Sequence, residues 1–92
     1  MSTSINFLAD DLQWRVIGNW SATEKGEPKQ GALNYGFSTQ DGALAYIANL
    51  LNIATRNEFN VRAEYGHLEV AAPKWCGMED FQGSYRVAQY IN

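Results

Sequence analysis

The 92-residue chain contains one cysteine, one histidine and two prolines, and no stretch of it is apolar for long enough to span a membrane. Cys76 cannot form an internal disulfide, which favours a reducing, intracellular compartment. His67 and Cys76 cannot supply the four ligands of a structural zinc site, and the carboxylates lack the spacing of a calcium-binding loop. No glycine run precedes a Lys-Ser or Lys-Thr pair, so a phosphate-binding loop is not indicated. We therefore expect no disulfide, no metal and no cofactor.

Residues that could carry catalysis are equally scarce. A cysteine nucleophile needs a base within hydrogen-bond reach, and the nine positions between His67 and Cys76 neither support nor exclude that contact. Because free cysteines are among the most buried residues, we expect Cys76 to be buried or half-buried and His67 to lie at the surface beside a turn. The carboxylate pairs at residues 10–11 and 79–80 are adjacent rather than facing partners. The sequence thus predicts a protein that is not an enzyme.

Apolar and aromatic residues are plentiful, at 46% and 13% of the sequence. This is enough for one core, so residues 1–92 are expected to form a single domain. Seven basic and ten acidic residues leave a formal net charge of −3, which disfavours general nucleic-acid binding and is compatible with a basic protein surface as partner. Residues 1–7 lack the basic start and long apolar core of a signal peptide, which predicts a cytosolic protein.

The segment from residue 38 to residue 56 predicts an amphipathic helix that begins near Thr39. Ser38 can cap the first free backbone N–H groups, and Asp41 lies where an acidic side chain meets the positive end of the helix. Polar side chains occupy one face, so we expect the other to cover a sheet. The residues expected to face that core recur at helical spacing and are Ala43, Leu44, Ile47, Ala48, Leu50, Leu51 and Ala54.

Strand-forming patterns precede and follow this helix. Alternating apolar residues predict strands at residues 13–21 and 31–37, a β-hairpin at 59–65 and 67–72 that turns at Gly66, and a last strand at 84–91. The hairpin is expected to expose Arg62, Glu64 and Glu69. Its expected core face holds Phe59, Val61, Ala63, Leu68, Val70 and Ala72.

The remaining segments are predicted as connections. Residues 22–30 are polar and broken by Gly26 and Pro28, which predicts a long exposed loop. Residues 73–83 predict an ordered connection, and residues 4–12 fit either a short helix capped by Ser4 or an extended lead-in. The order β-β-α-β-β-β predicts an α+β fold, in which an antiparallel sheet of four to five strands packs one central helix on one face.

Binding of another protein is the function that the residues favour. Tryptophan and tyrosine are frequent interface anchors, and an exposed loop at residues 23–30 would be free to reach a partner. Acidic side chains add contacts to a basic partner, which speed association and set orientation. The candidate partner-binding residues, chosen by exposure and charge, are Glu24, Glu27, Lys29, Glu64, Glu69, Trp75, Glu79 and Asp80.

The sequence begins Met-Ser-Thr-Ser-Ile-Asn-Phe-Leu-Ala-Asp-Asp-Leu-Gln-Trp-Arg, contains Lys-Trp-Cys-Gly-Met-Glu-Asp-Phe and ends Tyr-Ile-Asn. Taken end to end, it resembles small phage-encoded anti-CRISPR proteins, and among them the inhibitors of type I-F systems. The resemblance rests on overall size and likeness rather than on a motif, and these inhibitors share no common fold.

The resemblance implies a non-enzymatic inhibitor in the cytoplasm of the infected bacterial host. Such a protein binds protein subunits of the crRNA-guided surveillance (Csy) complex, with the guide RNA nearby, and blocks recognition of target DNA. The small net charge favours steric obstruction with a few acidic contacts over full mimicry of DNA. Neither sequence-specific DNA binding nor membrane association is implied. The alternative is a small cytosolic protein-binding adaptor or regulator without nucleic-acid or catalytic activity.

Overall fold

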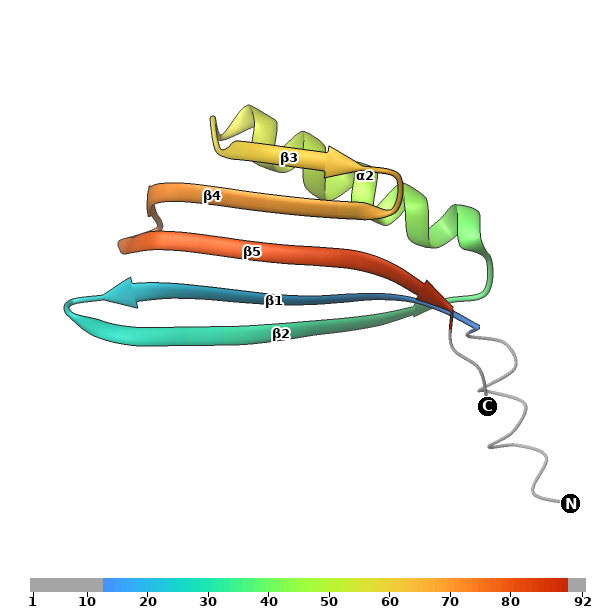
Figure 1. Cartoon of the computed structure of the whole chain (residues 1–92), viewed down its shortest axis with the longest axis horizontal. Coiled ribbons are helices and arrows are strands. Elements are labelled where there is room, and N and C mark those ends of the chain that lie inside the picture. Colours follow the sequence, from blue (N-terminus) through green and yellow to red (C-terminus); the bar gives the residue numbers. More distant parts are fainter. Residues whose placement is uncertain (1–12, 90–92) are drawn as a thin grey trace, which may run out of the picture.

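The computed structural model describes residues 13–89, which form a five-stranded antiparallel sheet and one α-helix (Figure 1). The elements follow one another as β1 (Trp14–Glu24), β2 (Glu27–Phe37), α2 (Gln40–Arg56), β3 (Asn60–Glu64), β4 (His67–Trp75) and β5 (Met78–Gln89). The strand order is β2-β1-β5-β4-β3, so β5 is central and β2 and β3 form the edges. The predicted α+β class and element order are confirmed. The prediction for residues 4–12 lies outside the described residues.

The first two strands form a long hairpin joined by a two-residue turn. Lys25 and Gly26 have backbone φ angles of 52° and 82°, the left-handed conformation that a type I′ turn requires. The register is unbroken along all eleven residues of each strand, and Ala22 is buried. The long exposed loop predicted at residues 22–30 is therefore wrong. Its polar composition reflects the solvent-exposed edge strand β2, where Pro28 is tolerated because no neighbouring strand needs its N–H group.

The connection predicted at residues 73–83 is also a tight hairpin. Cys76 and Gly77 form its turn with φ angles of 50° and 81°, so β4 continues to Trp75 and β5 already begins at Met78. Asp80 has a φ of 53°, and the pairing of β5 with β1 shifts by one residue beside it. Such a β-bulge bends a strand. The last strand is thus longer at its start than predicted, and residues 90–91 lie outside the described range.

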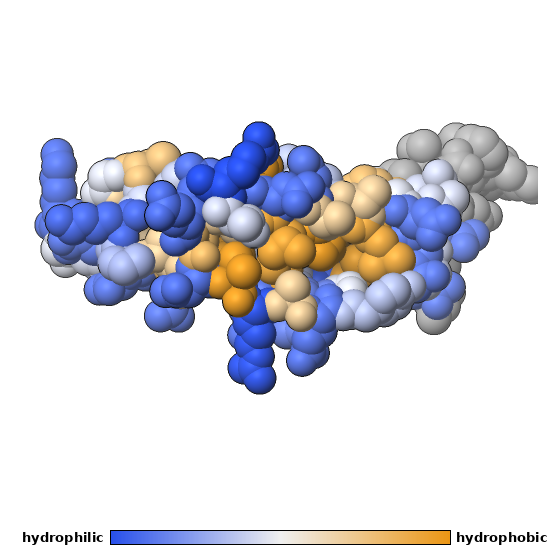
Figure 2. All heavy atoms as spheres, turned by 90° about the horizontal axis from the view of Figure 1, so that it is seen from above, coloured by the Kyte–Doolittle hydropathy of each residue, from blue (hydrophilic) through white to orange (hydrophobic). Residues whose placement is uncertain are grey.

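The hairpin of β3 and β4 is confirmed, with Gly66 in the turn at a φ of 70°. Its expected burial is only partly right. Leu68 is 1% exposed, whereas Val61 is 39% exposed and Ala63 is also exposed. The reason is the position of β3 at the edge of the sheet, where no further strand of the described part of the chain flanks it. Figure 2 views the molecule from the side of β3 and α2 and shows an apolar band between two hydrophilic margins.

The helix α2 lies on one face of the sheet, as predicted, but its cap differs by one residue. The Thr39 hydroxyl, not that of Ser38, accepts a hydrogen bond of 3.0 Å from the backbone N–H of Gly42. Of the expected apolar stripe, Ala48 is exposed and the other members are buried or half-buried. No helix among residues 13–89 is long and apolar enough to cross a membrane.

The core lies between α2 and the sheet. It is built from buried residues of the helix and of strands β1, β4 and β5. These residues alternate along each strand with mostly polar ones, which therefore point to the opposite face of the sheet. The buried core residues are Val16, Ala22, Ala43, Ile47, Ala54, Leu68, Val70, Ala72 and Phe81.

Candidate protein-binding surface

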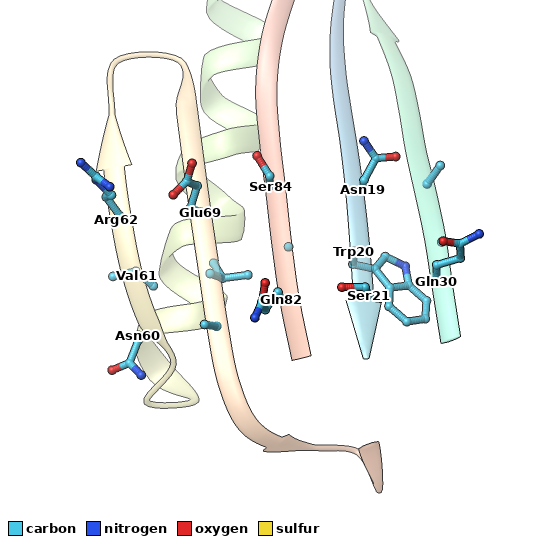
Figure 3. Close-up of a pocket in the computed structure, with 15 residues that line it drawn as sticks. Asn19, Trp20, Ser21, Gln30, Asn60, Val61, Arg62, Glu69, Gln82 and Ser84 are labelled. Carbon is cyan, nitrogen blue, oxygen red and sulfur yellow. The ribbon is translucent and has the colours of Figure 1, made fainter. Parts of the chain in front are cut away.

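No element within residues 13–89 covers the face of the sheet opposite α2, which carries polar side chains; we call it the open face. A hollow of about 970 Å³ extends across all five strands on this face (Figure 3). Because the strands hold these side chains at fixed spacings, the lining is organised by the rigid sheet rather than by loops. The polar side chains that line the hollow are Asn19, Ser21, Gln30, Asn60, Arg62, Glu69, Gln82 and Ser84.

Cross-strand pairing arranges the open face in rows. In the middle row, Ser84 of β5 lies between Asn19 of β1 and Glu69 of β4, and Glu69 in turn lies opposite Arg62 of β3. Small and uncharged polar groups thus occupy the β1 side, while opposite charges face each other at the β3–β4 side. The next row, in which Gln82 of β5 lies between Ser21 of β1 and Ala71 of β4, carries no charge, and Asn60 of β3 lies opposite Ala71.

His67 lies two residues before Glu69 on β4, in the adjacent row of the same face. Its Nε2 atom lies 3.6 Å from Oε2 of Glu69 and 3.4 Å from Oγ of Ser84. The side chains of His67 and Glu69 are 39% and 47% exposed, so an ion pair between them contributes at most about 1 kcal/mol to stability. These three side chains therefore form an accessible polar cluster whose groups remain available to a partner.

At the opposite side of the open face, Nη1 of Arg15 donates a hydrogen bond of 3.1 Å to Oδ1 of Asn34. This bond joins β1 to the edge strand β2 and orients both side chains. Residues 13–89 contain seven basic and eight acidic residues, a formal charge of −1, since Asp10 and Asp11 lie outside the described range. The described surface is thus close to electrically balanced, which argues against extensive phosphate mimicry.

The eight residues predicted to bind a partner fall into two groups. Glu64 and Glu69 lie on the open face, as predicted, next to Arg62 and His67. The other six lie on strands rather than on a loop or a connection, because both of the predicted connecting segments are tight hairpins. They gather at the end of the sheet where the β1–β2 and β4–β5 turns are neighbours (Figure 1), and they are Glu24, Glu27, Lys29, Trp75, Glu79 and Asp80.

This turn end contains a second, smaller hollow of about 530 Å³, lined by the β4–β5 turn and by Lys25 of the β1–β2 turn. Trp75 is half-buried there and packs edge-on against Phe59, with ring centroids 4.8 Å apart. Phe59 in turn contacts Phe81, which stacks on Trp20. Trp75 therefore belongs to an aromatic cluster packed against the core rather than acting as a free anchor.

Cys76 and His67 are not brought together. His67 begins β4 and Cys76 follows its other end, roughly 25 Å away for an extended strand of this length, so they cannot form a nucleophile and base pair. His67 lies beside the Gly66 turn, as expected, but Cys76 is exposed and the expectation of a buried thiol is wrong. Its place in a hairpin turn explains the exposure. Within residues 13–89, no group of three or more His, Cys, Asp and Glu residues is arranged to hold a metal ion.

Most of the polar lining of the hollow was not among the predicted site residues. Gln30 and Gln82 fall in segments that were predicted as connections and are in fact strands. The sequence feature that could have shown this is the pair of dipeptides Lys25-Gly26 and Cys76-Gly77, each of which lies between two segments that can form strands. Recognising both as two-residue turns would have extended the strands and placed these side chains on the open face.

Comparison with protein-family models, with curated proteins and with solved structures finds no match to this chain. The functional proposal is therefore supported by the surface itself and by the resemblance described above.

Proposed function

We propose that this protein is a non-enzymatic binding module that recognises another protein through the open face of its sheet. The observation that carries the proposal is the hollow of about 970 Å³ that crosses all five strands and is lined by amide, hydroxyl and charged groups. A rigid sheet presents these groups with little reorganisation, and the short side chains among them, such as Asn19 and Ser84, lose less rotamer freedom on binding than long ones do. The hollow is therefore suited to a complementary protein surface.

The charged groups lie at one side of the open face, which makes the surface asymmetric. Arg62 and Glu69 face each other at the β3–β4 side, next to Glu64 and His67, while Asn19 and Ser84 occupy the middle. Amides and hydroxyls can both donate and accept hydrogen bonds, so the middle accommodates a polar partner surface in many arrangements. The charges fix the orientation of the partner more than they add to affinity.

The specific partner that we propose is the type I-F surveillance complex. In this proposal the protein acts in the cytoplasm of an infected bacterium and lodges beside the Lys- and Arg-lined channel that holds guide and target. Glu64 and Glu69 contact basic side chains of a protein subunit, and the body of the domain obstructs target DNA. The resemblance to anti-CRISPR proteins supports this partner, and the nearly balanced charge of residues 13–89 favours obstruction over mimicry.

The proposal is tested by mixing the purified full chain with guide-loaded Csy complex and following target-DNA binding in a gel shift, with gel filtration of the same mixture. We expect co-elution and loss of the DNA-bound band. Unchanged DNA binding without co-elution would reject this partner. An adaptor role would then be the leading function, and a pull-down from lysate would identify what the open face binds.

The surface is tested separately with Ser84→Arg, which places a long side chain in the middle of the hollow. Ser84 is exposed, so the fold should tolerate the change, while binding of any partner should weaken by about tenfold or more. Asn52→Arg on the exposed side of α2 is the matched control and should bind as wild type. If Ser84→Arg binds normally and Glu24→Lys with Glu79→Lys does not, the turn end is the binding surface instead.

A further inference from the structure

Within residues 13–89, the outer edge of β2 is the longer of the two free edges of the sheet. β2 pairs with β1 along eleven residues on one side and with no described strand on the other. Natural sheets protect such edges with charges, prolines, bulges or a covering element. In β2 these devices are confined to its first three residues, and from Gln30 to Phe37 the strand has no charged residue and no proline. Among the described residues nothing pairs with this segment, which can therefore act as a template for another strand.

Pro28 indicates which backbone groups point outwards. It lies opposite Thr23 in the β1–β2 register, and a proline within a sheet is placed where its missing N–H would face away from the neighbouring strand. Hydrogen-bonding groups alternate between the two sides of a strand. The even-numbered residues from Gln30 to Gly36 therefore direct their N–H and C=O groups to the free edge.

We propose that a second copy of this chain pairs with this edge, antiparallel and β2 to β2, around a two-fold axis at Leu33. The outward groups of residues 30, 32, 34 and 36 then pair with those of residues 36, 34, 32 and 30 of the second copy. An isologous interface of this kind closes by itself and joins the two sheets into one of ten strands. The inference is independent of the proposed partner.

The side chains of β2 are self-complementary in this register. Tyr35, which is 52% exposed, falls opposite Gly31 of the second copy, and Gln30 falls opposite Gly36. Leu33 meets its own counterpart on the axis. The indole of Trp20 already covers Gly31, so Tyr35 gains an aromatic surface to pack against. Tyr35 and Gln30 thus each meet a glycine, the two Leu33 side chains meet each other, and no like charges face each other.

The other edge does not offer the same fit. β3 has only five residues, and a two-fold axis at its centre would place Arg62 directly opposite Arg62 of the second copy. Like charges in directly opposite positions are destabilising. The two edges therefore differ in length and in self-complementarity, which makes β3 the natural control.

The association is tested with the full chain by sedimentation equilibrium between about 1 μM and 1 mM, a range typical of weak to moderate dimers. We expect the mass to rise from 10.3 kDa to twice that value. Ala32→Lys adds a charge near the axis at an exposed position and should raise the dissociation constant by about tenfold or more. Ala63→Lys makes the same change at an exposed position of β3 and should leave the constant unchanged.

The register is tested by oxidative cross-linking in a Cys76→Ser background. Leu33→Cys places a thiol on the axis and should give a covalent dimer, whereas Gln30→Cys should not, because its counterpart is Gly36. Circular dichroism checks that each variant is folded. If Leu33→Cys does not fold, the effect of Ala32→Lys on the dissociation constant still tests the proposal. A wild type that stays monomeric at about 1 mM would overturn the proposal. Equal weakening of the dimer by Ala32→Lys and Ala63→Lys would also overturn it. If the chain is monomeric and its β2 edge instead binds a different protein, the edge belongs to that partner.

Discussion

The ring of Tyr85 lies over Gly18, its cross-strand neighbour on β1. A Cβ atom at residue 18 would overlap the ring, and one at Gly83 would lie 2.8 Å from the Tyr85 hydroxyl. The aromatic ring therefore occupies the space that two side chains would otherwise fill, between the sheet and α2. This contact brings a bulky side chain into the centre of a thin two-layer domain without separating the layers.

Gly18→Ala is expected to lower the free energy of unfolding by about 1–3 kcal/mol, because the added methyl group overpacks the site under Tyr85. Urea denaturation followed by circular dichroism measures the change. The control is the same substitution in a Tyr85→Ala background, where the ring is absent. A similar loss in both backgrounds would show that the ring is not responsible.

Alkaline pH is expected to destabilise the fold through two tyrosines. Burial raises the pKa of Tyr85 above its ordinary value of 10.0, and burial, followed by the neighbouring Tyr35, raises the pKa of Tyr46. A raised pKa means that the folded state holds the phenol proton more tightly than the unfolded state does. This stabilisation is complete below pH 10 and is lost as the pH rises through the folded-state values.

Urea denaturation at pH 8 and above pH 10 should therefore give a lower free energy of unfolding at the higher pH. Tyr85→Phe keeps the ring over Gly18 but removes the titrating hydroxyl, so its loss on raising the pH should be smaller than that of the wild type. An identical pH dependence of the two proteins would contradict the assignment to Tyr85.

Two aliphatic residues on neighbouring strands should respond very differently to truncation. Leu68 is 1% exposed, so Leu68→Ala should cost about 2–5 kcal/mol of stability through lost burial and a cavity. Val61 lies on the edge strand and is 39% exposed, so Val61→Ala should cost less than about 1 kcal/mol. Thermal and urea unfolding measure both. Equal losses would mean that β3 is covered in solution, for example by another strand.

The N-terminus of α2 offers a test at single-residue resolution. Thr39→Ala removes the hydroxyl that accepts from the Gly42 N–H and should cost about 1 kcal/mol. Ser38→Ala next to it should be nearly neutral, because Ser38 is exposed and does not make this bond. The reverse order of the two effects in urea denaturation would place the cap at Ser38.

The helix, the β3–β4 hairpin and the α+β class followed from the sequence by itself, because each is specified by contacts close together along the chain. The stripe containing Ala43 and Ile47 repeats every three or four residues, and Gly66 separates two alternating segments. Local propensity and periodicity are sufficient for elements of this kind.

Only the tertiary structure decided the extent of β1, β2 and β5, the burial of each edge and the composition of the open face. Residues 22–30 look like a loop because their side chains are polar, yet all of them except the turn residues Lys25 and Gly26 pair with a neighbouring strand, which satisfies their backbone. Val61 looks like a core residue but is exposed, because strand order places β3 at an edge. Strand order and register join residues far apart in sequence, such as Asn19, Ser84 and Arg62, and periodicity within one segment carries no information about such neighbours.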